Sequence, residues 1–270
     1  MVTPAQKQQS VAYQTEAHKA SHARACRLVS QSRTQAYYHK KMPAKDAEVK
    51  QLIAEVTAHG RKGRNQVIAQ LQRKHPCLSA SKIRRVYQKE GFSLYQRLKK
   101  RRLNHPVLPH EIPLAPHTEW AMDFMSDSLN CGKRFRTFNV IEPTTRQCLA
   151  LHIAPSLPTT RVIAQLEMLL QTHPKPQRIR TDNGPEFTSK HFQLWLKENN
   201  IQWAAIEKGK PQQNPIVERF NRTFREEVLD ANLFTSIAHA QELASHWQQY
   251  YNCERPHMAL NNKTPMEYAA

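Results

Sequence analysis

A proline-rich stretch, NHPVLPHEIPLAPHT, occupies residues 104–118 and contains four prolines. Proline fixes its own φ angle and has no amide hydrogen to donate, so neither a helix nor an inner strand is expected to run through this stretch. We predict that it is an extended connector and that separate structures form on its two sides. The predicted parts are a basic helical segment (1–45), a helical module (46–103), the linker (104–117) and a larger domain (118–270).

The positive charge of the chain is concentrated before this connector. The formal net charge is +18; residues 1–110 contain 23 Lys/Arg and 5 Asp/Glu, whereas residues 111–270 contain 17 of each. A basic arm on a neutral domain indicates a polyanionic partner, and nucleic acid is the expected one. No apolar run approaches the roughly 18–20 residues of a membrane helix, and the first residues lack the apolar core of a signal peptide. We therefore expect no membrane partner and a cytoplasmic location.

The basic part has the periodicity of short amphipathic helices. Two are expected within residues 23–38, and three more follow at 46–59, after the turn GRKGR, and at 79–91. The last three fit a helix-turn-helix module, although a solvated basic bundle fits equally well. On the first interpretation DNA is contacted by the third helix of the module and by the run RLKKRRLNH, through Lys82, Arg84, Arg85, Lys99, Lys100, Arg101 and Arg102.

Beyond the connector the pattern changes to strands and helices. Strands are predicted at 119–126, 135–142, 147–154, 177–181 and 201–206, with helices at 159–173, 189–200 and from Pro215 to 231. A three-stranded meander followed by alternating helix and strand predicts an α/β domain, a mixed five-stranded sheet flanked by helices.

Three carboxylates are placed where this fold could bring them together. Asp123 lies within the first strand, on the face opposite Trp120, Met122 and Phe124. Asp182 ends the fourth strand in RTDNGPEF, where Asn183-Gly184 favours a turn with positive φ; its plain interpretation is a solubilising turn residue.

Glu218 lies in the first turn of the helix that begins near Pro215, and 35 residues separate it from Asp182. If the first and fourth strands are neighbours, Asp123, Asp182 and Glu218 converge. Their mutual repulsion would then be relieved by Mg²⁺, which prefers oxygen ligands and in pairs catalyses in-line phosphoryl displacement.

The segments WAMDF, TDNGPEF, KGKPQQNPIVERFNRTFREEVL and YNCERPHMALNNKTPMEY, in this order, resemble the second-frame transposases of the IS-three family of insertion sequences. The resemblance extends over nearly the whole chain. It implies a ribonuclease H-like, retroviral-integrase-type core preceded by the helical basic module. It also implies that Asp123, Asp182 and Glu218 are the catalytic and metal-binding triad for two Mg²⁺ ions, for which Mn²⁺ could substitute.

The same resemblance implies DNA contacts around the triad. Arg222 and Arg225 follow Glu218 at helical spacing, and Lys208 and Lys210 lie on the preceding loop. A solvated salt-bridge face and an ordinary loop are the alternatives. Gln213 and Asn214 are expected to cap the helix, and the Arg255-Pro256-His257 signature to tie the tail to the core.

The function expected from these features is metal-dependent cleavage at the ends of an insertion sequence, followed by strand transfer. The partners are double-stranded DNA, as terminal inverted repeats and target, further copies of the chain on that DNA, and a first-frame protein that is normally fused to it by frameshifting. Because this sequence begins without that protein, poor specificity is expected of it alone. A catalytically silent DNA-binding regulator and a ribonuclease H-like nuclease without joining activity are the alternatives.

Overall fold

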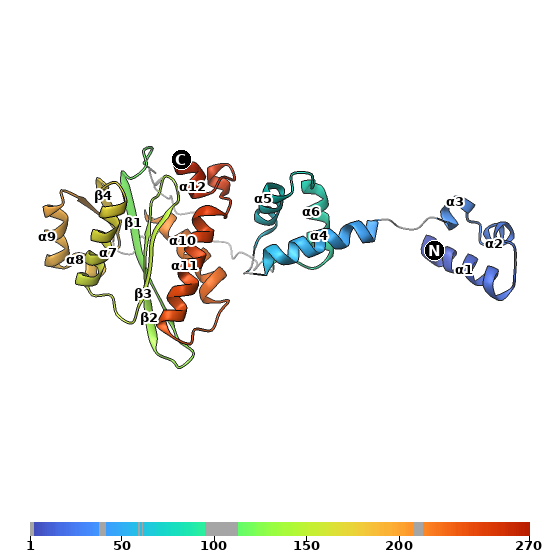
Figure 1. Cartoon of the computed structure of the whole chain (residues 1–270), viewed down its shortest axis with the longest axis horizontal. Helices are drawn as coiled ribbons and strands as arrows, with labels where there is room; N and C mark the ends of the chain where they lie inside the picture. The colour runs from blue at the N-terminus through green and yellow to red at the C-terminus, as the bar shows by residue number, and fades with distance from the viewer. Residues whose placement is uncertain (1–2, 38–41, 59, 61, 95–112, 208–212) are drawn as a thin grey trace. The chain divides into compact units, whose positions relative to one another are not determined.

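The computed structural model describes residues 3–37, 42–58, 60, 62–94, 113–207 and 213–270 (Figure 1). The chain forms two compact units, Met1–Gln51 and Leu52–Ala270, and the boundary falls inside helix α4 (Met42–Thr57). Most of the predicted linker lies outside the described residues, so the domain limits drawn from the sequence stay predictions. Among the described helices, none is long and apolar enough to cross a membrane.

The first unit contains α1 (Pro4–Ala17), α2 (His22–Leu28) and α3 (Arg33–Ala36). The two short helices predicted within 23–38 are confirmed, whereas α1 was not predicted. Helix α1 begins with a capping box in which Thr3 accepts a hydrogen bond from the Gln6 amide and the Gln6 side chain accepts one from the Thr3 amide. The small core of this unit is made by Val11, Ala25 and Cys26.

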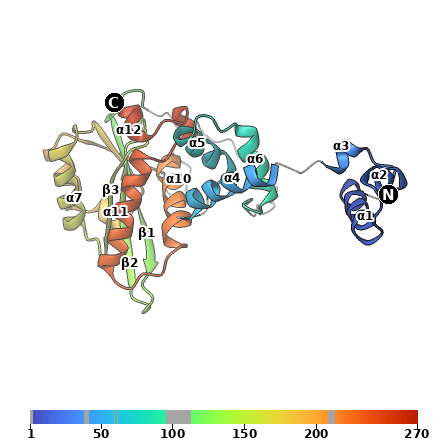
Figure 2. The same cartoon turned by 45° about the vertical axis from the view of Figure 1, so that its right-hand side comes forward.

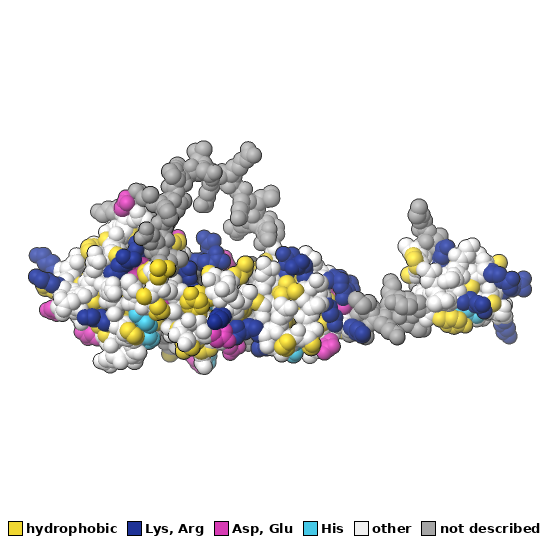
Figure 3. Space-filling view, turned by 90° about the horizontal axis from the view of Figure 1, so that it is seen from above, with side chains coloured by type: hydrophobic (Ala, Val, Ile, Leu, Met, Phe, Trp, Pro, Cys, Tyr) yellow, Lys and Arg dark blue, Asp and Glu magenta, His cyan; other side chains and the backbone are white. Residues whose placement is uncertain are grey.

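The helical module of the second unit follows the predicted pattern. Helix α5 (Arg64–Lys74) buries Val67, Ile68 and Leu71, and α6 (Ala80–Lys89) buries Ile83, Val86 and Tyr87. The Ser79 hydroxyl caps α6 by accepting from the Lys82 amide. Arg84 and Arg85 are exposed on α6, while Lys82 is half-buried. On the face shown in Figure 3, Lys and Arg side chains are spread over the surface.

The larger domain is built on a five-stranded sheet in the order β3-β2-β1-β4-β5. Strands β1 (Glu119–Ser128), β2 (Arg134–Ile141) and β3 (Cys148–Ala154) form an antiparallel meander, and β4 (Arg178–Thr181) and β5 (Gln202–Ala205) extend it in parallel from β1. The predicted mixed sheet and all five predicted strands are confirmed.

Helices cover both faces of this sheet (Figures 1 and 2). One face packs against α7 (Thr159–Thr172) and α9 (Lys190–Glu198), the other against α10 (Pro215–Phe224) and α11 (Ile237–Cys253). Side chains of β1 point alternately to the two faces of the sheet. Trp120 and Met122 are buried on the α7 and α9 side, and Ala121 and Met125 are buried on the α10 and α11 side. Asp123 therefore projects toward the α10 face, as predicted.

Two features of the helices differ from the sequence prediction. The helix predicted from Pro215 to 231 is α10 followed by a π-helical turn, Arg225–Leu229. The 17-residue helix α11 and the short helices α8 (Pro185–Thr188) and α12 (Pro265–Ala269) were not placed by the sequence analysis.

A buried carboxylate ties the first strand to the fourth. Glu119 at the start of β1 is fully buried and accepts hydrogen bonds from Arg178 Nε at 2.5 Å and from Arg180 Nε and Nη2 at 2.9 Å. Because both arginines belong to β4, these charged contacts reinforce the parallel pairing on which the position of Asp182 depends.

Candidate active site

The pairing of β1 with β4 brings two of the predicted acidic residues together. Ala121 lies opposite Arg180 in this parallel pair. Asp123 and Asp182, each two residues further on, therefore lie next to each other where β4 ends. The pKa of Asp123 is raised to about 6, first because burial disfavours its charged form and then because the charges of Asp182 and Glu218 lie near it. The three carboxylates therefore interact electrostatically.

Asp123 is fixed by neighbours that the sequence analysis missed. Its Oδ1 accepts from the Phe124 amide at 2.8 Å, and its Oδ2 accepts from Asn221 Nδ2 at 2.7 Å. Asn221 Oδ1 in turn accepts from buried Asn139 Nδ2 at 2.6 Å, and Asn139 lies opposite Asp123 in β2. An asparagine inside the apolar strand RFRTFNVI was the available sequence signal, because a buried amide needs polar partners.

Asp182 is held by the backbone of its own turn. Its Oδ1 accepts from the Gly184 amide at 3.1 Å, and Pro185 then begins α8. The predicted turn with positive φ is wrong: Gly184 has φ −60°, because it is the N-cap of α8. A Cβ at this position would lie 3.1 Å from Asp182 Oδ1, a tight contact, so a larger residue would press on the carboxylate.

Glu218 is positioned by the start of α10. Asn214 Nδ2 donates to the Met122 carbonyl of β1 at 3.4 Å, which links the helix start to the strand that carries Asp123. Asn214 is the N-cap residue of α10 as predicted, although its side chain makes no cap hydrogen bond. The capping role predicted for Gln213 is wrong, because Gln213 exchanges hydrogen bonds with Glu207 instead. Glu218 itself is half-buried in the first turn of α10.

The donor chemistry of this site fits a hard divalent cation. Three carboxylates share a partly buried region, and carboxylate oxygens are the ligands that such a cation prefers. As they stand, the described residues contain no group of three or more His, Cys, Asp or Glu side chains arranged to hold a metal. Asp123 and Asp182 each accept hydrogen bonds from nearby amide groups, which fix both carboxylates in this region.

The raised pKa of Asp123 predicts a pH-dependent effect on stability. Because the folded protein holds this proton more tightly than an ordinary aspartate of pKa 3.8, the free energy of unfolding falls as the pH rises from about 4 to about 6, and the full penalty persists above that window. Asp123→Asn should therefore stabilise the metal-free protein at about pH 8 by roughly 1–3 kcal/mol, with the difference vanishing near pH 4.

Urea unfolding in the presence of a chelator measures this difference, and Asp230→Asn, a change at an exposed aspartate, is the control. An Asp123→Asn difference that is the same at both pH values would contradict the assignment of a raised pKa to this carboxyl group.

Comparisons with known proteins agree with this architecture. Two models described as Integrase core domain match residues 113–211 and 199–265. The chain is 33% identical over 252 residues to a 31.7 kDa protein of insertion element IS407 from Burkholderia multivorans, covering 93% of this chain and 91% of the relative. It is 32% identical over 274 residues to a 39.2 kDa protein of insertion element IS476 from Xanthomonas euvesicatoria, covering 100% of this chain and 78% of the relative.

The chain belongs to the insertion-sequence transposases with an integrase core. DNA transposition and integration, by polynucleotidyl transfer, is accordingly its function class. Its fold is that of the solved simian T-cell lymphotropic virus intasome, bound to PP2A regulatory subunit B56 gamma, with a TM-score of 0.52 and 18% identity over 74% of this chain and 73% of the viral chain. The predicted ribonuclease H-like, integrase-type fold is confirmed.

The basic residues expected to contact DNA in this transposase have different surroundings. Arg222 is exposed on α10. Arg225 bonds to the core: it donates to the Ser126 carbonyl at 2.9 Å and to Asp127 at 3.2 Å. The salt-bridge alternative thus describes Arg225 here, and DNA contact by either arginine stays a prediction. Six further candidates lie outside the described residues: Lys208, Lys210, Lys99, Lys100, Arg101 and Arg102.

The tail signature of this transposase binds its core as predicted. Arg255 Nη2 pairs with Glu227 Oε1 at 3.3 Å, and Trp247 Nε1 donates to the other oxygen of the same buried carboxylate at 2.9 Å. Glu227 lies in the π-helical turn after α10, so the Arg255 segment is fastened to the helix that carries Glu218.

Proposed function

We propose that this transposase cuts the ends of its insertion sequence and joins them to target DNA with Asp123, Asp182 and Glu218 as catalytic and metal-binding residues. The proposal rests mainly on the β1–β4 register, which brings two aspartates together where β4 ends, beside α10. The bound group is two Mg²⁺ ions, for which Mn²⁺ can substitute. Such ions supply activation of the attacking oxygen and stabilisation of the leaving oxygen.

The protein contributes position and charge to this reaction. Asn221 and the Phe124 amide orient Asp123, the Gly184 amide orients Asp182, and the start of α10 presents Glu218. These amide contacts would keep Asp123 and Asp182 in place to hold the cation. The exposed Arg222 is placed to hold a phosphate of the DNA end near the site.

Two displacements at phosphorus follow from this arrangement. Water attacks a phosphodiester at the element end, breaks the P–O bond to the 3′ oxygen and releases a 3′-OH. That hydroxyl then attacks a phosphodiester of the target, forming one new P–O bond as another breaks. Neither step needs a covalent enzyme intermediate, because each nucleophile attacks phosphorus directly.

We infer that the basic module supplies phosphate contacts for the same DNA. Lys82, Arg84 and Arg85 on α6 and the run Lys99–Arg102 are the candidates, and both terminal repeats and target DNA are the substrates. We further propose that several copies act together on DNA, that a first-frame protein is the fusion partner, and that the reaction takes place in the bacterial cytosol.

The test is strand cleavage and joining by the full chain on DNA that carries the element's terminal repeats, with Mg²⁺ or Mn²⁺. We expect both products, and none of either when a chelator is present. Cleavage without joining would identify the chain as a nuclease, and DNA binding without either product would identify it as a silent regulator. Both outcomes would contradict the proposal.

A further inference from the structure

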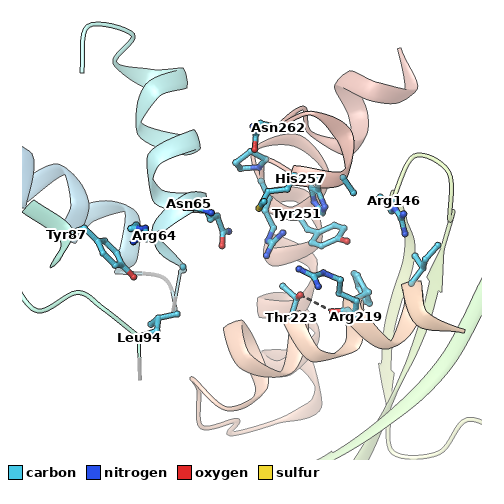
Figure 4. Close-up of a pocket in the computed structure, with 18 of the residues that line it drawn as sticks. Arg64, Asn65, Tyr87, Leu94, Arg146, Arg219, Thr223, Tyr251, His257 and Asn262 are labelled. Atoms are coloured by element: carbon cyan, nitrogen blue, oxygen red, sulfur yellow. Dashed lines mark hydrogen bonds between the residues drawn. The ribbon is translucent and has the colours of Figure 1, made fainter. Parts of the chain in front are cut away.

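A pocket of 770 Å³ lies on a different face of α10, apart from the three carboxylates (Figure 4). Arg219 and Thr223 of α10 line it, whereas Glu218 and Arg222 are each one residue before them and point elsewhere. Figure 4 shows Arg219 beside Tyr251 and His257, with Arg146 on one side and Arg64 and Asn65 on the other. Residues from four distant parts of the sequence therefore meet around one space.

The walls of this pocket are cationic. Its lining contains four arginines, Arg64, Arg146, Arg219 and Arg255, and no aspartate or glutamate among the described residues. Arg64 and Arg219 are exposed, whereas Arg146 and Arg255 are partly buried. Of the four, Arg255 alone forms an ion pair with a described residue, namely Glu227. Among the described residues, the other three guanidinium groups thus line the pocket without a carboxylate in ion-pair contact.

Three buried side-chain nitrogens of the lining residues have no hydrogen-bond partner among the described residues. They are Arg146 Nε, Arg255 Nε and His257 Nε2. The pKa of His257 is lowered to about 3, first by burial and then by the charges of Arg255, Arg146 and Arg219, so its imidazole is neutral. Two buried Nε donors, of Arg146 and Arg255, thus add to the arginine charges of the lining, and such a lining favours an anion with several acceptor oxygens.

We propose that this pocket binds backbone phosphates of DNA, as a second contact on the face of α10 turned away from the carboxylates. Arginine forks are suited to phosphate oxygens, and the pocket is larger than one phosphate group requires. Its lining continues onto Arg64 and Asn65 of the basic helical module, so a strand lying there runs from the integrase core to that module. The identification of the bound anion as DNA rests on the proposed function. The expectation that the pocket binds an anion rests on its lining residues alone.

The test measures equilibrium DNA binding, independently of catalysis. In full-length Asp182→Asn protein with a chelator present, a short duplex is titrated at several salt concentrations. Arg219→Gln and Arg146→Asn each remove one pocket charge; asparagine tolerates the positive φ of 64° at residue 146. Arg134→Gln is the matched control, since Arg134 is an exposed arginine outside the pocket.

Each pocket variant is expected to weaken binding by about tenfold and to reduce the salt slope by about one, while the control changes neither. Unchanged thermal unfolding shows that the variants are folded. Pocket variants that bind DNA like Arg134→Gln would overturn the proposal. So would calorimetric binding of inorganic pyrophosphate that is lost in these variants while DNA binding is retained, because the ligand would then be a free phosphate compound. Because the experiment measures DNA binding and not turnover, its outcome does not depend on whether Asp123, Asp182 and Glu218 are the catalytic residues.

Discussion

Asp182→Asn is expected to reduce both cleavage and joining by about a thousandfold, equivalent to roughly 4 kcal/mol of transition-state stabilisation. Asparagine retains the oxygen that accepts from the Gly184 amide, so the turn at the end of β4 keeps its structure. It lacks the second anionic oxygen and the charge that a divalent cation requires. The measurement is the rate of both product bands on terminal-repeat DNA with Mg²⁺.

Asp230→Asn provides the matched control for this loss. Asp230 is exposed and its nearest ion pair, with Arg225, spans 3.7 Å, so removing its charge should leave both rates within about twofold. Joining by Asp182→Asn at the rate of the control would exclude Asp182 from the chemistry.

Glu119→Gln is expected to produce the largest loss of stability. Glu119 is buried against Arg178 and Arg180, so glutamine leaves two positive charges at the β1–β4 junction without their counter-charge and replaces one acceptor oxygen by an NH₂ donor. Breaking a buried pair of this kind costs about 3–5 kcal/mol, or roughly 10 °C in the unfolding midpoint. Thermal unfolding followed by circular dichroism measures the change.

Glu267→Gln is the comparison for this prediction, because Glu267 also pairs with an arginine, Arg73, but at the surface, where its side chain is 45% exposed. An exposed pair contributes less than about 1 kcal/mol. Equal shifts in the two variants would mean that the contacts of Glu119 do not hold the parallel strands together.

The sheet was predictable because its strands carry their signal locally. Alternation in EWAMDFMS and the apolar run of QCLALHIA mark strands without reference to the rest of the chain, and the Trp120 face of β1 followed from the same alternation. The position of the triad required one further assumption, that β1 and β4 are neighbours. The charged contacts of Glu119 with β4 reinforce that pairing, and their partners lie 59 and 61 residues away.

The missed features depend on contacts between distant segments. Asn221 and Asn139 lie 82 residues apart, and their hydrogen bond exists only once α10 packs on β2. The π-helical turn after α10 occurs within a continuous helical pattern, where periodicity gives no warning. The cationic pocket unites α5, α10, the turn after β2 and the tail, so the distribution of charge along the chain could not reveal it.

Joining of DNA that already carries a free 3′-OH end tests most directly whether one carboxylate site performs both displacements. Glu218→Gln should lose joining of this pre-cleaved DNA to the same extent as it loses cleavage of intact ends, because the proposed mechanism assigns the same three carboxylates to both steps. Loss of cleavage with joining at the rate of the unmodified protein would show that the two reactions use different sites, and would contradict the account given for Asp123, Asp182 and Glu218.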